Sequence, residues 1–160
     1  MREQSGDASK RQGVEIDLFK RLSTKWVADI SASFVKSRLV GAPESSSHIP
    51  NAKGRVMGAG ITWADENGSL SARIRHFGDA ALVEDNTVSN PPTTLLNAKY
   101  EQVFNNYVIG LEILNILDSK DCDVAYFFKS QTSRSADPAE DIHFHPVLPR
   151  SYRLTVSYKL

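Results

Sequence analysis

The chain has 160 residues and a mass of 17.7 kDa, and 41% of its residues are hydrophobic and 24% are charged. This size and composition are typical of one ordinary soluble domain with its own core, and they exclude intrinsic disorder over the whole length. The 19 basic and 19 acidic residues cancel, so no whole-domain attraction to a polyanion is expected. A single cysteine excludes an intramolecular disulfide and a cysteine-based zinc site.

The sequence shows neither a transmembrane helix nor a secretory signal, and this determines which compartment we expect. The richest apolar stretch, Val103 to Leu117, is interrupted by three asparagines and Glu112, so no transmembrane helix is expected. The first 13 residues lack the apolar run of a secretory signal. We therefore expect the cytoplasm or another reducing intracellular compartment, without secretion by a classical signal.

The N-terminal segment divides into an arm and an ambiguous stretch. Residues 1–13 are polar and without apolar periodicity, which predicts a mobile arm ahead of a single globular domain at 14–160. Within 14–40 the apolar residues recur at both helical and strand spacing. The pattern leaves helix and strand open there, and we favour a short helix to about Leu22 and a strand from about Lys25.

A hairpin is predicted in the next part of the chain. Residues 41–54 are rich in Gly, Pro and Ser and are expected to form an exposed loop. The strand-like runs 55–63 and 69–77 follow, and Asn67-Gly68 between them indicates a tight return.

Residues 93–117 predict one long amphipathic helix. Pro91-Pro92 followed by two threonines is typical of a helix start. Apolar residues then repeat at steps of three and four, with polar residues between them. Further isoleucines and valines widen the apolar arc, which indicates contacts on two sides of the helix. The repeating residues are Leu96, Tyr100, Val103, Phe104, Tyr107, Leu111, Leu114 and Leu117.

The C-terminal part predicts two more strands. Residues 122–130 alternate and are apolar on both faces, and residues 151–160 alternate as a half-buried strand. The expected fold is α+β, a single domain in which an antiparallel sheet of about five or six strands is packed by the long helix, with a short N-terminal helix as a second one.

His143 and His145 form the first candidate site. Two imidazoles separated by one residue of a strand point to the same face and could hold one metal ion, with Asp141 beside them. His76 or His48 would have to complete the ligands. The alternative is a solvent-facing pair beside a turn, and no other cofactor is expected.

A second candidate site is an arginine-bearing sheet face for an anionic partner. Arg73 and Arg75 share one face of a strand, and two guanidiniums can grip phosphate or carboxylate in bidentate fashion. Arg55 on the partner strand, with Phe77 and Trp63, would add charge and a stacking surface. The alternative is an ordinary solvated sheet face.

Surplus apolar surface predicts self-association. It comes from the wide helical arc, the doubly apolar strand 122–130 and the alternating C-terminal strand at a sheet edge. Self-association or partner docking is therefore the inference that the sequence favours most. The candidate residues are Tyr107, Ile109, Ile113, Ile116, Phe127 and Tyr158.

These patterns favour three functions in order. Nucleophile and nucleotide-binding motifs are absent, so no enzyme is expected. The first function is a non-enzymatic, self-associating structural or interaction protein, compatible with a viral or phage assembly, coat or matrix component. The second is a module that binds RNA or a phosphorylated ligand, and the third is a small His-dependent metalloprotein. The expected partners are further copies of the chain and a nucleic acid or another anion.

Overall fold

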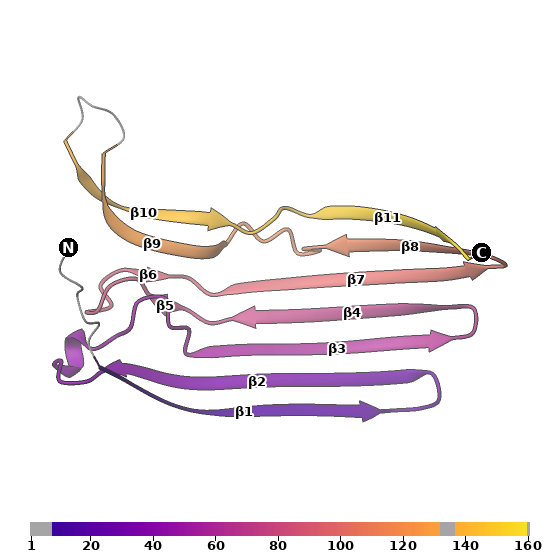
Figure 1. The fold of residues 1–160 in the computed structure, drawn as a ribbon, viewed down its shortest axis with the longest axis horizontal. Coiled ribbons are helices and arrows are strands. Elements are labelled where there is room, and N and C mark those ends of the chain that lie inside the picture. Colours follow the sequence, from indigo (N-terminus) through magenta and orange to yellow (C-terminus); the bar gives the residue numbers. More distant parts are fainter. Residues whose placement is uncertain (1–7, 132–136, 160) are drawn as a thin grey trace.

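The computed structural model describes residues 8–131 and 137–159, and its main feature is a seven-stranded antiparallel sheet (Figure 1). The strand order is β1-β2-β3-β4-β7-β8-β11, so each strand pairs with the strands that precede and follow it in the meander. The strands are β1 (Ser9–Arg21), β2 (Trp26–Leu39), β3 (Arg55–Asp65), β4 (Gly68–Phe77), β7 (Thr93–Phe104), β8 (Tyr107–Leu114) and β11 (Ser151–Tyr158).

Smaller elements occupy one end of this sheet. β9 (Cys122–Ser130) and β10 (Ala139–Pro146) form a hairpin that projects at the upper left of Figure 1. β5 (Ala80–Ala81) pairs with β6 (Ser89–Asn90), and η1 (Glu44–Ser46) is a single 3-10 turn. In the described part of the chain, no helix is long and apolar enough to cross a membrane.

The two ends of the sheet differ in their connections. At one end, on the right of Figure 1, residues 22–25, 66–67 and 105–106 make short turns. Asn105 has φ 50°, a left-handed conformation that asparagine tolerates and that a two-residue return needs. At the other end the connections are long and carry the smaller elements. We call these the turn end and the loop end.

Alternation along each strand explains why these residues form a sheet. One row across five strands reads Leu18, Ile30, Ala59, Ile74 and Leu96, each the register partner of the next. Because successive side chains point to opposite faces, this register keeps every second side chain of each strand on one common face.

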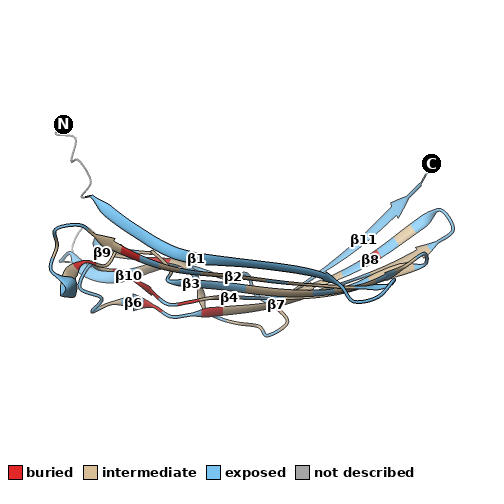
Figure 2. Ribbon diagram, turned by 90° about the horizontal axis from the view of Figure 1, so that it is seen from below, coloured by how far each residue is buried: buried red, intermediate tan, exposed pale blue. Residues whose placement is uncertain are grey.

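The buried hydrophobic residues lie at the loop end. The hydrophobic side chains that are buried among the described residues are Ala80, Ala81, Leu82 and Ala125. Figure 2 shows buried positions near β6 and β9, whereas the long strands are intermediate or exposed apart from Ser37 in β2, Thr93 in β7 and Gly110 in β8. The sheet therefore has no buried layer over either face in the described residues.

The α+β prediction is wrong, because the structure is nearly all β. Residues 93–117 form β7, a turn and β8 instead of a helix, since positions four apart share a face in a strand as well as in a helix. The segment to Leu22 is β1 rather than a short helix. The hairpin at 55–77 and the strand at 122–130 are confirmed.

The expected arm falls partly outside the described residues. Residues 1–7 are not described, whereas Ser9 to Gly13 form the first part of β1, paired with β2. Residues 132–136, between β9 and β10, also lie outside the described part.

Candidate functional site

One face of the seven-stranded sheet is apolar along the middle of its strands and carries polar and charged side chains toward both ends. We call it the apolar face. Its side chains are exposed, and Leu154 in β11 reaches 71% exposure. In a soluble domain these positions would pack against a second layer, and so large an exposed patch marks an interaction surface. By register the exposed apolar members are Val14, Ile16, Leu18, Trp26, Ile30, Phe34, Met57, Ile61, Leu70, Ile74, Tyr100, Phe104, Tyr107, Ile109, Leu111, Tyr152, Leu154, Val156 and Tyr158.

Aromatic side chains border the apolar face at the turn end. Trp26 is the register partner of Trp63, and Phe104 is the partner of Tyr107. The rings of Tyr107 and Tyr158 lie 4.9 Å apart between centroids. Such rings combine an apolar body with a polar edge or hydroxyl, and they suit a boundary between an apolar and an aqueous phase.

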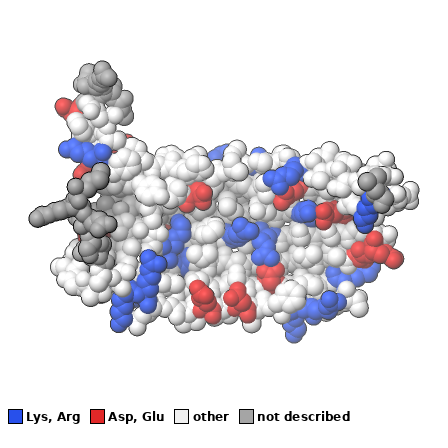
Figure 3. All heavy atoms as spheres, in the orientation of Figure 1, with Lys and Arg blue, Asp and Glu red and all other residues white. Residues whose placement is uncertain are grey.

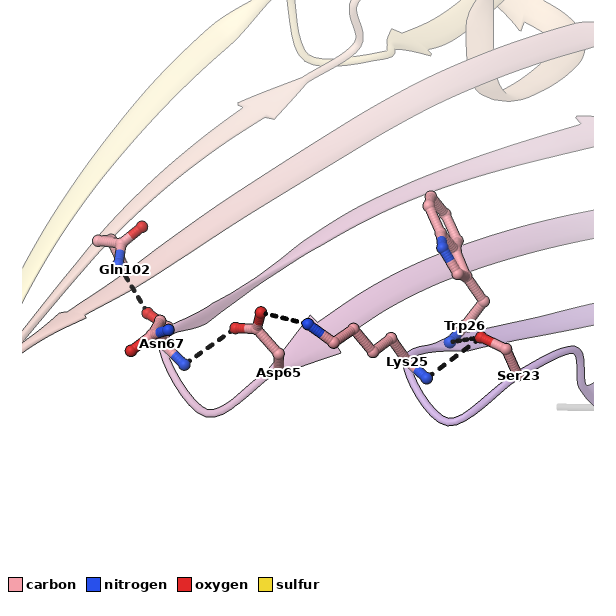
Figure 4. A network of polar contacts seen from close by, with 6 residues as sticks. All are labelled: Ser23, Lys25, Trp26, Asp65, Asn67 and Gln102. Atoms are coloured by element: carbon pink, nitrogen blue, oxygen red, sulfur yellow. Dashed lines mark hydrogen bonds and ion pairs between the residues drawn. The ribbon is translucent and has the colours of Figure 1, made fainter.

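A polar network fastens the turns next to these rings (Figure 4). Lys25 Nζ lies 3.0 Å from Asp65 Oδ2, joining the β1–β2 turn to the β3–β4 turn. The Asn67 backbone N–H donates to Asp65 Oδ1 over 2.9 Å, and Gln102 Nε2 donates to the Asn67 carbonyl oxygen over 2.8 Å. Lys25 also lies over the Trp63 ring, 5.8 Å from its centroid. The network therefore ties β7 to the first two hairpins.

The opposite face is polar and carries matched charges. Arg73 Nη2 lies 2.7 Å from Asp29 Oδ1, an ion pair that joins β4 to β2 across β3. The strand between them has Gly60 at the crossing, where a Cβ would lie 2.6 Å from Asp29 Oδ1 and 2.7 Å from Arg73 Nη2. Glycine at this position thus leaves the space that the ion pair occupies. We call this side the polar face.

Further pairs extend the polar face across the sheet. Arg153 Nη1 donates to Glu112 Oε2 over 2.8 Å between β11 and β8, and Lys99 Nζ lies 2.9 Å from Glu101 Oε1 on β7. Figure 3 shows acidic and basic side chains interspersed over the strands. Phe19 is an exception, because it is apolar, lies at a polar-face position and is 76% exposed.

The residues predicted to bind an anion are divided between the two faces. Arg73, Arg75 and Phe77 alternate on the polar face of β4, whereas the register places Arg55 and Trp63 on the apolar face of β3. Arg73 is already paired with Asp29. The five residues therefore do not form one surface.

His143 and His145 lie on one face of β10, as the spacing predicts. The His143 ring stacks on Phe128 at 4.0 Å between centroids, and its Nε2 is buried without a hydrogen-bond partner. His145 Nδ1 is 4.0 Å from Asp123 Oδ2, with both side chains exposed. In the described part of the chain, no three His, Cys, Asp or Glu side chains are placed to hold a metal ion.

The residues predicted to mediate self-association also lie in different parts of the structure. Tyr107, Ile109 and Ile113 lie on the apolar face of β8, and Tyr158 lies beside Tyr107 on β11. Ile116 is in the connection after β8, where its N–H donates to the Leu96 carbonyl. Phe127 belongs to the projecting hairpin.

A polar cluster connects the projecting hairpin to the sheet, and no sequence pattern indicates this cluster. The side-chain amide of Asn115, which is 4% exposed, donates to the Ser119 and Leu148 carbonyls and accepts from the Ser119 N–H. Asp118 accepts from the Arg150 N–H over 3.2 Å and pairs with Lys120 over 2.9 Å. The hydrogen bond from Lys120, followed by that from Arg150, lowers the pKa of Asp118 below its ordinary value.

Sequence reasoning missed the apolar face as a whole, although its signal is present. Tyr107, Ile109, Leu111 and Ile113 alternate over the length of a strand, and Asn105-Asn106 before them is a hairpin turn signal. In residues 14–40 the same alternation also fits helical steps; the strand favoured from about Lys25 is confirmed by β2, and the short helix favoured to about Leu22 is wrong.

The fold resembles solved receptors for metal uptake. The chain matches the siderophore receptor PiuA from Acinetobacter baumannii with a TM-score of 0.71 at 16% identity, over 94% of this chain and 22% of that one. It matches the ferric-catecholate import receptor Fiu from E. coli K12 with a TM-score of 0.71 at 18% identity, over 92% and 20% of the two chains. The ferric yersiniabactin uptake receptor FyuA from Yersinia pestis gives a TM-score of 0.67 at 15% identity, over 92% and 23%.

These matches establish a likeness of fold over about a fifth of each receptor chain. No protein-family model and no curated protein matches the sequence. The likeness corrects the predicted functions, because the structural neighbours are receptors and transporters rather than viral assembly or RNA-binding proteins. The seven-stranded sheet resembles a segment of these receptors in fold.

Proposed function

We propose that this chain is a segment of the wall of an outer-membrane receptor that imports a metal-containing solute, with its apolar face toward lipid and its polar face toward the interior. The observation that carries the proposal is the opposite character of the two faces, one apolar and exposed over seven strands and the other charged. This location replaces the expected cytoplasmic one.

An antiparallel sheet suits a lipid environment when it is part of a closed wall. Every backbone N–H and C=O must be paired inside the hydrocarbon, because no water is present there to bind it. The meander pairs the backbone of each inner strand on both sides. Side chains then alternate between lipid and interior, which is the pattern of this sheet.

The width of the apolar face fits a membrane. On β2 its large side chains run from Trp26 to Phe34, a span of eight residue steps. At a rise of about 3.3 Å per residue and a tilt of about 40°, this span covers roughly 20 Å, close to the ~25 Å apolar band of such walls. The turn-end aromatic residues stand where the band would meet water.

The connections support an orientation. Short turns on one side and long loops on the other are typical of outer-membrane walls, in which the longer loops face the exterior. We therefore place the loop end, with the β9–β10 hairpin, outside the cell and the turn end in the periplasm. The class of solute is supported by the structural neighbours, which include a siderophore receptor, a ferric-catecholate import receptor and the copper transporter OprC.

The test compares two neighbouring positions on β2 in vesicles. Cysteine replaces Ile30 on the apolar face or Ser31 on the polar face, each in a Cys122→Ser background so that no other thiol is present. After folding into phosphatidylcholine vesicles, the Ser31→Cys protein should react with a water-soluble maleimide and the Ile30→Cys protein should not, although both react in urea. Equal labelling of the two folded proteins would contradict the proposal.

Intrinsic fluorescence supplies a second readout. The two tryptophans of the chain, Trp26 and Trp63, are partners on the apolar face. Brominated phosphatidylcholine should quench them, whereas a water-soluble quencher should reach them poorly. The prediction that the chain forms homo-oligomers stays a proposal, to be checked by sizing the detergent-solubilised protein. The prediction that the chain is not an enzyme also stays a proposal.

A further inference from the structure

The charged side chains on the apolar face are unevenly distributed between its two ends. At the loop end, the face carries Lys10, Lys36, Arg38 and Arg55 beyond the last apolar side chains of β1 to β3. The one acidic residue at an apolar-face position in the seven described strands is Asp65, which lies at the turn end and is paired with Lys25. The loop-end border of the apolar face is therefore basic. We call these four residues the basic border.

The register brings the members of the basic border close together. Lys10 and Arg38 are direct cross-strand partners, Lys36 is two residues from Arg38 on the same face, and Arg55 is the partner of Phe34. Direct partners have Cβ atoms about 5 Å apart, and like charges placed in this way destabilise a sheet. An anion between these cations would remove that cost.

The described residues supply little of the negative charge that the basic border needs. No carboxylate in the described part of the chain lies within ion-pair distance of Lys10, Lys36 or Arg38. Arg38 Nε is buried without a hydrogen-bond partner, although one of its terminal nitrogens donates to the Ser37 carbonyl. Arg55 has an exposed partner in Asp79 at 3.5 Å.

A cavity of about 440 Å³ opens among these residues. Phe34, Lys36, Arg38 and Arg55 line it, and the long connections contribute His48 and Asp79. Asp79 is its one acidic lining residue. The cavity thus has room for a phosphate group, three cationic side chains to bind it and an apolar side chain toward the membrane band.

We propose that the basic border binds the phosphate headgroup of a membrane lipid whose acyl chains lie along the apolar face below it. This inference rests on the proposed function, because that function places the apolar face in the bilayer and the basic border at headgroup level. Charge complementarity favours a phosphomonoester lipid, since guanidinium and ammonium groups bind its oxygens through charge-assisted hydrogen bonds. A lipid held there would also screen the repulsion between Lys10 and Arg38.

The experiment measures lipid retention by the full chain in nonionic detergent micelles, using native mass spectrometry and phosphatidic acid as the probe. Micelles cover the apolar face whether or not the protein belongs in a membrane. The test variant is Lys36→Gln/Arg38→Gln, and the matched control is Lys20→Gln/Lys159→Gln, which removes two cations at or near the turn end.

The proposal predicts that the test variant binds phosphatidic acid about 30-fold more weakly, at roughly fivefold for each cation lost, and that the control binds like wild type. Phosphatidylcholine should be retained equally by all three proteins. Equal binding of phosphatidic acid by the test variant and wild type would overturn the proposal. Displacement of the lipid by millimolar inorganic phosphate would also overturn it, because the site would then take the free anion.

Failure of the proposed function gives a different result. In that case the wild-type chain would not show face-selective labelling in phosphatidylcholine vesicles, whatever it does with phosphatidic acid in micelles. Loss of phosphatidic acid binding together with intact labelling in the test variant would support both the membrane placement and the lipid site.

Discussion

The substitution Ile30→Arg should distinguish a sheet whose apolar face contacts lipid from a sheet whose apolar face contacts water. Ile30 lies on the apolar face of β2, four residues from Trp26 and four from Phe34. At about 3.3 Å per residue and a tilt of about 40°, its side chain is roughly 10 Å from either border of the apolar band. It is therefore close to the midplane of the proposed membrane.

The expected cost follows from this depth. A lipid-facing arginine at the midplane costs about 2–4 kcal/mol of folding free energy, falling to about 0–1 kcal/mol near an interface. At about 1.4 kcal/mol per factor of ten, Ile30→Arg should lower the folding equilibrium constant roughly 30- to 1000-fold, and Trp26→Arg much less. In water the cost would be much smaller, because Ile30 is 53% exposed and a charged residue at such a surface position changes stability by about 0.5 kcal/mol or less.

Guanidinium titration of the chain in phosphatidylcholine vesicles measures these free energies, with tryptophan fluorescence as the signal. Ser31→Arg is the matched control, since it introduces the same side chain one residue away at the same depth on the polar face. Its effect should be close to zero. Equal destabilisation by Ile30→Arg and Ser31→Arg would refute the assignment of the two faces.

Three further predictions concern polar contacts. Gly60→Ala should open the ion pair between Asp29 and Arg73, because a Cβ at residue 60 would lie 2.6 Å from Asp29 Oδ1. A double-mutant cycle on Asp29 and Arg73 should give a coupling energy of about 1 kcal/mol or less, and this coupling should disappear in the Gly60→Ala background. Asn115→Ala should lower the free energy of unfolding by about 3 kcal/mol for the three lost side-chain hydrogen bonds and by about 1 kcal/mol for its φ of 50°. Asn115→Gly should lose the hydrogen bonds but avoid the backbone cost, and thermal unfolding measures the difference. The pKa of Asp118 is lowered in the folded state, so its contribution to stability is present above the unfolded pKa and is lost as pH falls through the folded pKa. The difference in melting temperature between wild type and Asp118→Asn should therefore vanish in strong acid. A difference that stays constant with pH would contradict this.

Strand alternation could be recognised in some segments and not in others for a physical reason. In β9 and β11 the alternating residues stand between clear turns, and both strands were predicted at nearly their observed bounds. In β7 and β8 the residues Leu96, Tyr100 and Tyr107 also fit helical steps, since positions four apart share a face in both structures. The decisive signal was Asn105-Asn106, which closes a two-residue turn between the strands.

The candidate site was harder to predict, because amino-acid composition does not show whether a face of the sheet contacts lipid or water. Half of each strand is apolar and half polar, so the whole chain has the hydrophobic content of a soluble domain. The pairs Asp29 with Arg73 and Glu112 with Arg153 join residues far apart in the chain, and their proximity depends on register. His143 and His145 were placed correctly on one face, yet no third ligand lies beside them among the described residues.

The distribution of buried residues limits where the stability of this sheet can originate. Its long strands satisfy their backbone groups through the ladder, but net hydrogen-bond gains in water are small because the unfolded chain is hydrogen-bonded to water. The buried apolar side chains of the described residues are three alanines and Leu82, all near the loop end. Burial of the apolar face by lipid or detergent must then supply most of the hydrophobic free energy that a core supplies in a soluble domain. Stability should accordingly rise steeply once detergent exceeds its micelle concentration, and a sheet equally stable without detergent would contradict this account.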